Sequence, residues 1–130
     1  MADKNSETEE TGGVVKPSET VERHDVTAGT ATRMQTLVGS EDGARNFSMR
    51  RFIMGPGGGM PLHTNTVEHE QYVLKGRARV RIGSEVHEVS QADVLFIPAG
   101  APHDYTVIEA PFEFLCIVPN GVDRVEILDP

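Results

Sequence analysis

The chain has 130 residues, which is enough for one ordinary domain and too few for two. Its net charge of −8 argues against nucleic acid or an anionic membrane as the main partner, and a single cysteine, Cys116, excludes an internal disulfide framework. The longest apolar run, 114–118, is far too short to cross a membrane, and the first residues lack the apolar segment of a signal peptide. These features predict a cytoplasmic protein.

The first 25 residues differ in composition from the rest of the chain. They hold five apolar side chains beside seven acidic and three basic residues. A segment this polar buries too little apolar surface to offset the entropy that it loses on ordering. We therefore expect residues 1–25 to form a mobile tail and residues 26–130 to form the folded domain.

Alternating apolar and polar residues, rather than helical spacing, mark the predicted elements of the body. The first strand, 47–54, is expected to end at a glycine-rich loop, 55–59, which cannot continue a ladder. Short strands at regular intervals are typical of a sandwich or barrel, so the expected fold class is all-β. The later strands are expected at 70–75, 78–82, 85–89, 94–97, 103–108 and 112–118, with a hairpin turn at Gly83 and Ser84.

Three of the five histidines are candidates for a metal site. His63 and His69 are six positions apart, so in an extended segment both point to one face, which Asn65 and Gln71 share but the glutamates flanking His69 do not. His103 opens another strand directly after a Pro-Ala-Gly-Ala-Pro turn. Two strands that present imidazoles to one interior can build a site for Zn, Fe, Cu or Ni. The other two histidines lie in polar segments and are expected to face solvent.

The spacing around the first two histidines resembles the first motif of the cupin family. That motif is a Gly, five residues, His-x-His, three or four residues, Glu, six residues and Gly. Gly57, His63, Asn65, His69 and Gly76 keep every spacing, although Asn65 stands at the second His and His69 at the Glu. A His at the Glu position resembles a subgroup of small one-domain cupins that use four His ligands.

The segment around the third histidine resembles the second cupin motif: Gly, five residues, Pro-x-Gly, two residues, His, three residues and Asn. Ala92, Pro98, Gly100, His103 and Val107 keep its spacing, and fifteen residues separate the two motifs, as in small microbial cupins. The resemblance covers about residues 45–119. It implies a cupin double-stranded β-helix, that is, a jelly-roll barrel.

The resemblance also implies one bound divalent transition metal ion (Zn, Mn, Fe, Ni or Cu), held by His63, His69 and His103. Asn65 offers an amide oxygen, which is a poorer ligand for these metals. It is expected to ligate weakly, to bond a metal-bound water, or to leave the position open. Three imidazole ligands with open positions are typical of a catalytic rather than a structural site.

Three further side chains are expected around the metal. Alternation places Tyr105 inward with the histidine two positions before it, and Cys116 inward with Glu113 facing water. Gln71 and Tyr105 are candidates for bonding a substrate or a metal-bound water. Cys116 is either a small buried hydrophobic residue or a redox-sensitive thiol near the metal.

The resemblance predicts a metal-dependent enzyme that acts on a small organic molecule, and slightly favours dioxygenase-type oxidation over isomerisation or hydrolysis. The alternatives are a non-catalytic metal- or ligand-binding sensor and a structural, metal-free cupin. Exposed sheet edges tend to pair or be covered, and small cupins commonly pair through them, so a homodimer is expected.

Overall fold

Antiparallel strands hold most of the residues that the computed structural model describes, 12–129. No helix in this range is long and apolar enough to span a bilayer. The elements in chain order are η2 (Ser18–Thr20), β1 (His24–Asp25), β2 (Thr30–Val38), η3 (Ser40–Asp42), β3 (Phe47–Asn65), β4 (His69–Ile82), β5 (Glu85–Ser90), β6 (Val94–Ile97), β7 (His103–Pro119) and β8 (Val125–Ile127), of which η2 and η3 are short 3-10 turns.

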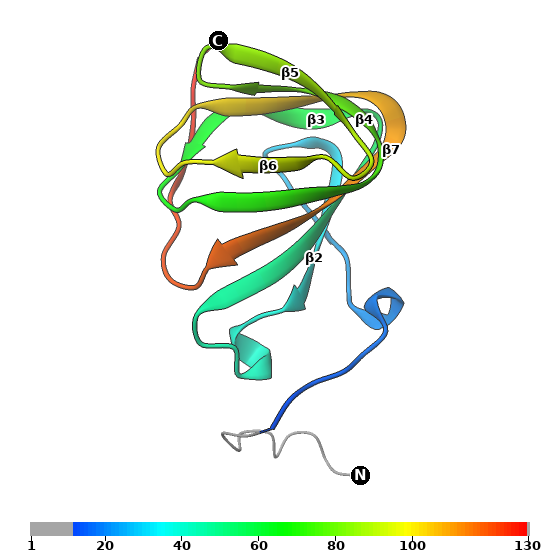
Figure 1. Ribbon diagram of the computed structural model, residues 1–130, viewed down its shortest axis with the longest axis vertical. Coiled ribbons are helices and arrows are strands. Elements are labelled where there is room, and N and C mark those ends of the chain that lie inside the picture. Colours follow the sequence, from blue (N-terminus) through cyan, green and yellow to red (C-terminus); the bar gives the residue numbers. More distant parts are fainter. Residues whose placement is uncertain (1–11, 130) are drawn as a thin grey trace.

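The strands form one sheet in the order β1-β2-β3-β7-β4-β5, with β6 added to β4 and β8 added to β3. β7 pairs antiparallel with both β3 and β4, so it lies at the centre of the sheet. Figure 1 shows that the sheet curls round on itself and encloses an interior. The expected all-β jelly-roll barrel is confirmed.

Several strands are longer than the sequence predicts, because the chain bends without leaving the sheet. β3 runs through the glycine-rich stretch, but its ladder to β7 is interrupted between Met54 and Gly59. Gly59 has a φ of +155°, and a Cβ there would lie 2.1 Å from the carbonyl oxygen of Tyr105. Only glycine permits this approach of β3 to β7. In the same way, β7 joins the two strands predicted at 103–108 and 112–118.

The inner face of the barrel packs around Phe114. Its ring centroid lies 5.1 Å from that of Phe52, 5.3 Å from Tyr105 and 5.4 Å from Phe112. Aromatic contacts of this kind add stability beyond the apolar area that they bury. The other core residues are Met54, Val73, Ala78, Val80, Val89, Leu95, Ile97, Cys116 and Val118.

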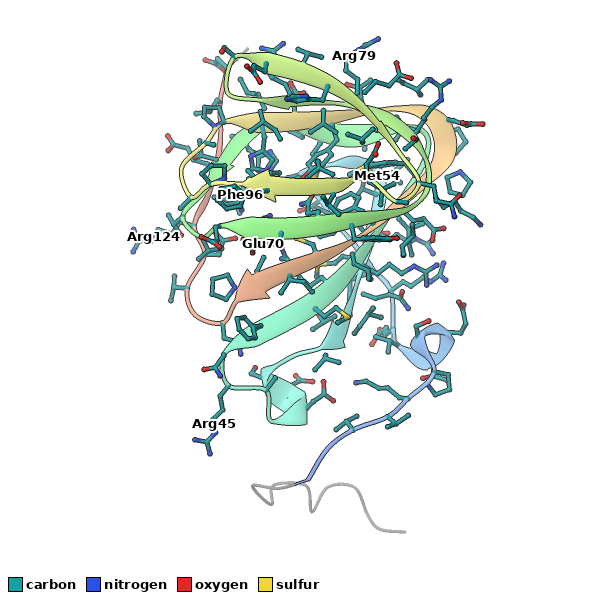
Figure 2. All side chains as sticks on the ribbon, viewed as in Figure 1. Arg45, Met54, Glu70, Arg79, Phe96 and Arg124 are labelled. Carbon is teal, nitrogen blue, oxygen red and sulfur yellow. The ribbon has the colours of Figure 1, made fainter. Side chains whose placement is uncertain are left out.

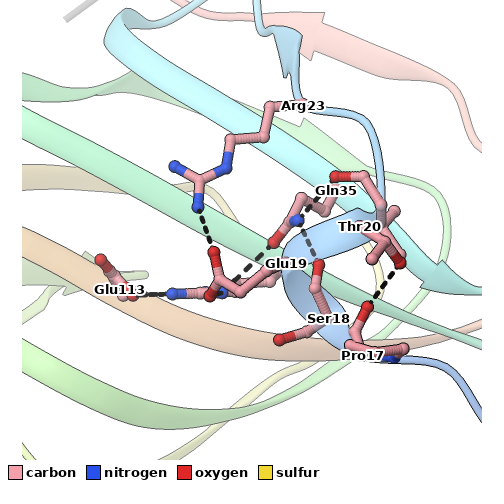
Figure 3. A network of polar contacts seen from close by, with 9 residues as sticks. Pro17, Ser18, Glu19, Thr20, Arg23, Gln35 and Glu113 are labelled. Carbon is pink, nitrogen blue, oxygen red and sulfur yellow. Dashed lines mark hydrogen bonds and ion pairs between the residues drawn. The ribbon is translucent and has the colours of Figure 1, made fainter.

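Part of the predicted tail contacts the barrel (Figure 3). Gln35 of β2 is fully buried, and its amide nitrogen donates to the carbonyl oxygens of Ser18 and Val21, at 2.9 Å each. The strand β1 pairs with β2. Residues 1–11 lie outside the described residues, so the mobility expected for 1–25 stays a prediction. The contacts of residues 18–25 were not predicted from their polar composition.

Glu113 does not face water, contrary to the alternation argument. Only 8% of this residue is exposed, because it forms an ion pair of 2.6 Å with Arg51 on the neighbouring strand. Arg51 also lies 3.7 Å from Glu19 of η2, which Figure 3 shows beside the pair. The side chain is on the outer face of β7, as alternation requires, but the N-terminal segment and Arg51 shield it there.

Candidate metal centre

Two of the candidate ligands are direct neighbours across a pair of strands. His63 near the end of β3 pairs in register with His103 at the start of β7, and their ring centroids lie 4.1 Å apart. Both are buried, with 4% and 1% of the residue exposed. The Nδ1 atom of His63 donates to the carbonyl oxygen of Pro61 at 2.7 Å, and that of His103 to Ala101 at 2.9 Å. Because Nδ1 carries the proton, the Nε2 atom of each ring has a free lone pair.

The third histidine comes from a third strand, β4, which pairs with β7. His69 begins β4, and its ring centroid lies 6.0 Å from that of His103. It is 5% exposed, and its Nε2 is buried without a hydrogen-bond partner. Glu68 and Glu70 on either side are exposed, which confirms the predicted orientation of this segment. The structure therefore brings together the three histidines that the sequence selected.

Asn65 lies beside the histidines, with its two side-chain atoms in different situations. The amide nitrogen donates to an Asp123 carboxylate oxygen at 2.9 Å, whereas Oδ1 is buried and has no partner. The Asp123 carboxylate also accepts the backbone N–H of Thr66 at 3.0 Å. Holding the NH2 group of Asn65 in this way leaves the oxygen as the atom available to a ligand in the site.

The donor atoms fit a transition metal in chemistry and protonation. Burial is the main reason that the pKa of His69 and of His103 is lowered to about 4, so both rings are neutral at neutral pH, which metal binding requires. The orphaned Nε2 of His69 and Oδ1 of Asn65 are buried polar atoms that a bound ion would satisfy. Within residues 12–129, no three His, Cys, Asp or Glu side chains lie in coordinating geometry for one ion.

The three predicted neighbours of the metal form one hydrogen-bonded chain. The Tyr105 hydroxyl donates to Gln71 Oε1 at 3.0 Å, and Gln71 Nε2 lies 3.5 Å from the sulfur of Cys116. That sulfur lies 3.5 Å from Nδ1 of His69. Burial raises the pKa of Tyr105 well above its usual value, which keeps its phenol protonated. The structure thus links the three residues in one chain of contacts, which ends at the candidate ligand His69.

A cavity of about 340 Å³ opens onto the histidines. This volume is in the range of sites for small organic molecules. Its polar lining includes His63, Asn65, His69 and His103 together with Gln71 and Tyr105. Its apolar lining includes Met34, Phe52, Met54, Met60 and Phe114.

Two charged residues of this cavity, Arg50 and Asp123, were missed in the sequence. Arg50 is two positions before Phe52 in β3, so alternation places both on the inner face. A charged side chain is rarely buried, and this made the signal easy to overlook. Asp123 follows β7 outside any regular element, and no periodicity in the sequence pointed to it.

Comparison with curated proteins gives two relatives with enzymatic names. The chain is 30% identical over 80 residues to 1-methylthio-D-xylulose 5-phosphate methylsulfurylase of Rhodospirillum rubrum, covering 61% of this chain and 51% of that protein. It is 28% identical over 83 residues to an oxalate decarboxylase of Bacillus subtilis, covering 60% of this chain and 22% of that protein. The chain thus matches about half or less of the length of these relatives.

Comparison with solved structures gives likenesses over more of the chain. The polyketide cyclase RemF from Streptomyces resistomycificus superposes with a TM-score of 0.83 at 26% identity, covering 91% of this chain and 87% of that one. A cupin 2 domain-containing protein from Halorhodospira halophila superposes with a TM-score of 0.71 at 33% identity, covering 76% and 71%.

The family comparison covers the three histidines and Asn65 of the candidate site. Residues 50–118 match the family described as "Cupin domain", and this range is more than half of the chain. It also includes Gln71, Tyr105 and Cys116. The chain therefore belongs to the cupin family.

Proposed function

We propose that this cupin is a metal-dependent enzyme that acts on a small, partly apolar organic molecule. The observation that carries the proposal is the meeting of three buried histidines, two of them fixed with Nε2 free, at the wall of an apolar cavity. His63, His69 and His103 would hold one divalent ion of Zn, Mn, Fe, Ni or Cu, with Oδ1 of Asn65 beside it. Bound there, such an ion supplies a Lewis acid for a substrate oxygen or, for a redox-active metal, a centre for O2 chemistry.

The side chains around the histidines would position the substrate and control water. Phe52, Met54 and Phe114 offer an apolar wall on which the body of the molecule packs and from which water is excluded. The buried Tyr105 hydroxyl keeps its proton and holds Gln71 by a hydrogen bond. The amide of Gln71 is thereby oriented beside His69 and is available to bond a substrate oxygen.

Two reaction types are compatible with this arrangement. The likeness to a polyketide cyclase over nine-tenths of the chain supports non-redox ring closure, with carbonyl groups of the substrate activated by the Lewis acid. Dioxygenase-type oxidation is the second candidate, because three neutral protein ligands leave coordination positions open. The sequence alone slightly favoured oxidation, and the cyclase likeness reverses that order.

The metal content of the purified protein distinguishes both reaction types from a metal-free cupin. Protein purified without an affinity tag should contain about one metal ion per chain, and His63→Ala should lose it. The matched control is His87→Ala, because His87 is exposed on β5 and does not line the cavity. A metal-free wild-type protein whose melting temperature is indifferent to chelator and to both substitutions would refute the proposal.

Activity measurements then distinguish the two reaction types. The Zn, Mn and Fe(II) forms should be incubated with linear 1,3,5-triketones, which can close a six-membered ring by intramolecular aldol addition, and with catechols and flavonols while O2 uptake is followed. Ring closure without O2 uptake supports the first reaction type, and O2 uptake supports the second. If no metal form turns over any of these substrates, the protein is a non-catalytic metal-binding protein.

A further inference from the structure

The cavity contains a positive charge that the proposed metal chemistry does not use. Arg50 of β3 lines the cavity and pairs in register with Cys116 of β7. One terminal nitrogen of its guanidinium lies 3.5 Å from the sulfur of Cys116, and the guanidinium carbon lies 5.2 Å from the centroid of the Phe52 ring. Its Nε is buried and has no hydrogen-bond partner. An arginine has five N–H donors, so most of its capacity is unused.

No carboxylate among residues 12–129 lies within 4.0 Å of Arg50, unlike its neighbour Arg51, which pairs with Glu113 at 2.6 Å. The two carboxylates that line the same cavity are engaged elsewhere. Asp25 lies 3.5 Å from Arg33, and Asp123 accepts from Asn65 and Thr66. A half-buried charge without a counter-ion is unfavourable for folding, so the stability of the barrel does not explain this arginine.

We propose that Arg50 binds the ionised oxygen of an organic anion whose apolar body packs on Phe52 and Phe114. The guanidinium is planar and presents a fork of donors that matches a carboxylate or the delocalised oxygens of an enolate. The preferred substrate is therefore an apolar ring or short chain that carries one such group, with another part of the molecule reaching the histidines. This inference rests on the proposed function for the reaction, but the binding of the anion does not require the metal.

The test compares anions with neutral molecules of the same shape. Benzoate is paired with benzamide, and 5,5-dimethylcyclohexane-1,3-dione, which is an enolate at pH 7.5, is paired with its neutral methyl enol ether. Calorimetry gives the Kd of each probe for wild type, Arg50→Gln and Arg50→Lys, in metal-loaded and in chelator-treated protein. The control variant is Arg79→Gln, since Arg79 is an exposed strand arginine outside the cavity (Figure 2).

Wild type should bind at least one anion about tenfold or more tighter than its neutral partner, as expected for a hydrogen bond to a charged group. Arg50→Gln should abolish this preference, Arg50→Lys should keep part of it, and Arg79→Gln should leave it unchanged. Which pair shows the larger effect distinguishes a carboxylate from an enolate. Measurement without metal matters because an anion cannot then gain affinity by ligating an ion.

A readout on the unaltered chain covers the case in which Arg50→Gln does not fold. The Nε–H signal of Arg50 in 15N NMR, identified by its loss in Arg50→Lys, should shift with the anions and not with the neutral partners. Equal binding of both members of each pair by wild type, a preference that survives Arg50→Gln, or an unshifted signal would each overturn the inference. A protein that holds no metal but keeps an Arg50-dependent anion preference would refute the proposed function and leave this inference standing.

Discussion

Acidification should destabilise the metal-free protein through the two buried histidines. His69 and His103 have their pKa lowered to about 4 in the folded chain, first by burial, whereas an unfolded chain has the ordinary value near 6.5. Between these values the unfolded state binds more protons than the folded state, so stability falls as the pH falls. Well above pH 6.5 both states hold neutral rings and this contribution vanishes.

The size of the effect follows from the difference between the two pKa values. From pH 7 to pH 5, each ring should lower the free energy of unfolding by about 2 kcal/mol. Such a loss is a large part of the total stability of a small domain, which is about 5–15 kcal/mol. The ring centroids lie 6.0 Å apart, so a first proton on the folded protein makes a second less favourable, but this coupling acts near the folded pKa of about 4, and the two contributions are nearly additive between pH 7 and pH 5.

Urea unfolding in the presence of a chelator, at pH 7 and pH 5, measures this loss. His69→Gln and His103→Gln should each lose about 2 kcal/mol less than wild type over this interval, and the exposed His87→Gln should lose as much as wild type. Subtracting the loss of a variant from that of wild type removes the contribution of carboxylates that titrate in the same pH range, because both proteins share them. If His69→Gln and wild type lose the same amount, burial of these rings does not control their protonation. In the metal-loaded protein, metal release and melting should move together on acidification, because protons compete with the ion for the imidazoles.

Three other changes test the packing and the assembly. Gly76→Ala should lower the free energy of unfolding by more than about 3 kcal/mol, because its Cβ would lie 2.2 Å from the Pro111 carbonyl oxygen. Gly83→Ala, also at positive φ but in open space, should lower it by only about 1–2 kcal/mol. Equal losses in urea unfolding would contradict this. Phe114→Ala should cost about 3–5 kcal/mol in the same assay, because three aromatic rings surround that side chain; a loss below about 1 kcal/mol would show that the ring is not central to the core. Light scattering of a micromolar sample should give twice the chain mass of 14.2 kDa, since the short strand β6 exposes apolar side chains such as Phe96 (Figure 2), and a monomer mass would rule out the homodimer.

Local alternation predicted the inward side chains within each strand. His63 and His69 were predicted to share a face on the assumption that the chain between them is extended; both are buried, although the chain bends at residues 66 and 67 between β3 and β4. The strand at 94–97 and the hairpin turn at Gly83 and Ser84 were also predicted correctly. These features depend on neighbouring residues alone, so a single sequence determines them.

Features that depend on distant segments were not predicted. Glu113 is shielded by Arg51 and by the N-terminal segment, which precedes it by about ninety positions, and no local pattern reports such a contact. The merging of predicted strands reflects register shifts that a binary pattern does not encode. Arg50 follows the alternation, but its inward position was not predicted because a charged side chain is rarely buried.

The hydrogen bonds of Gln35 bear on where a shortened version of the chain should begin. A fragment starting at residue 26 would keep every strand from β2 onward, yet its Gln35 amide would lose both carbonyl acceptors, Ser18 and Val21. Leaving a buried donor without acceptors costs about 1–3 kcal/mol, and the same cut would remove Glu19 from Arg51. For expression or crystallisation, the smallest fragment that preserves the barrel therefore starts before η2, at about residue 16.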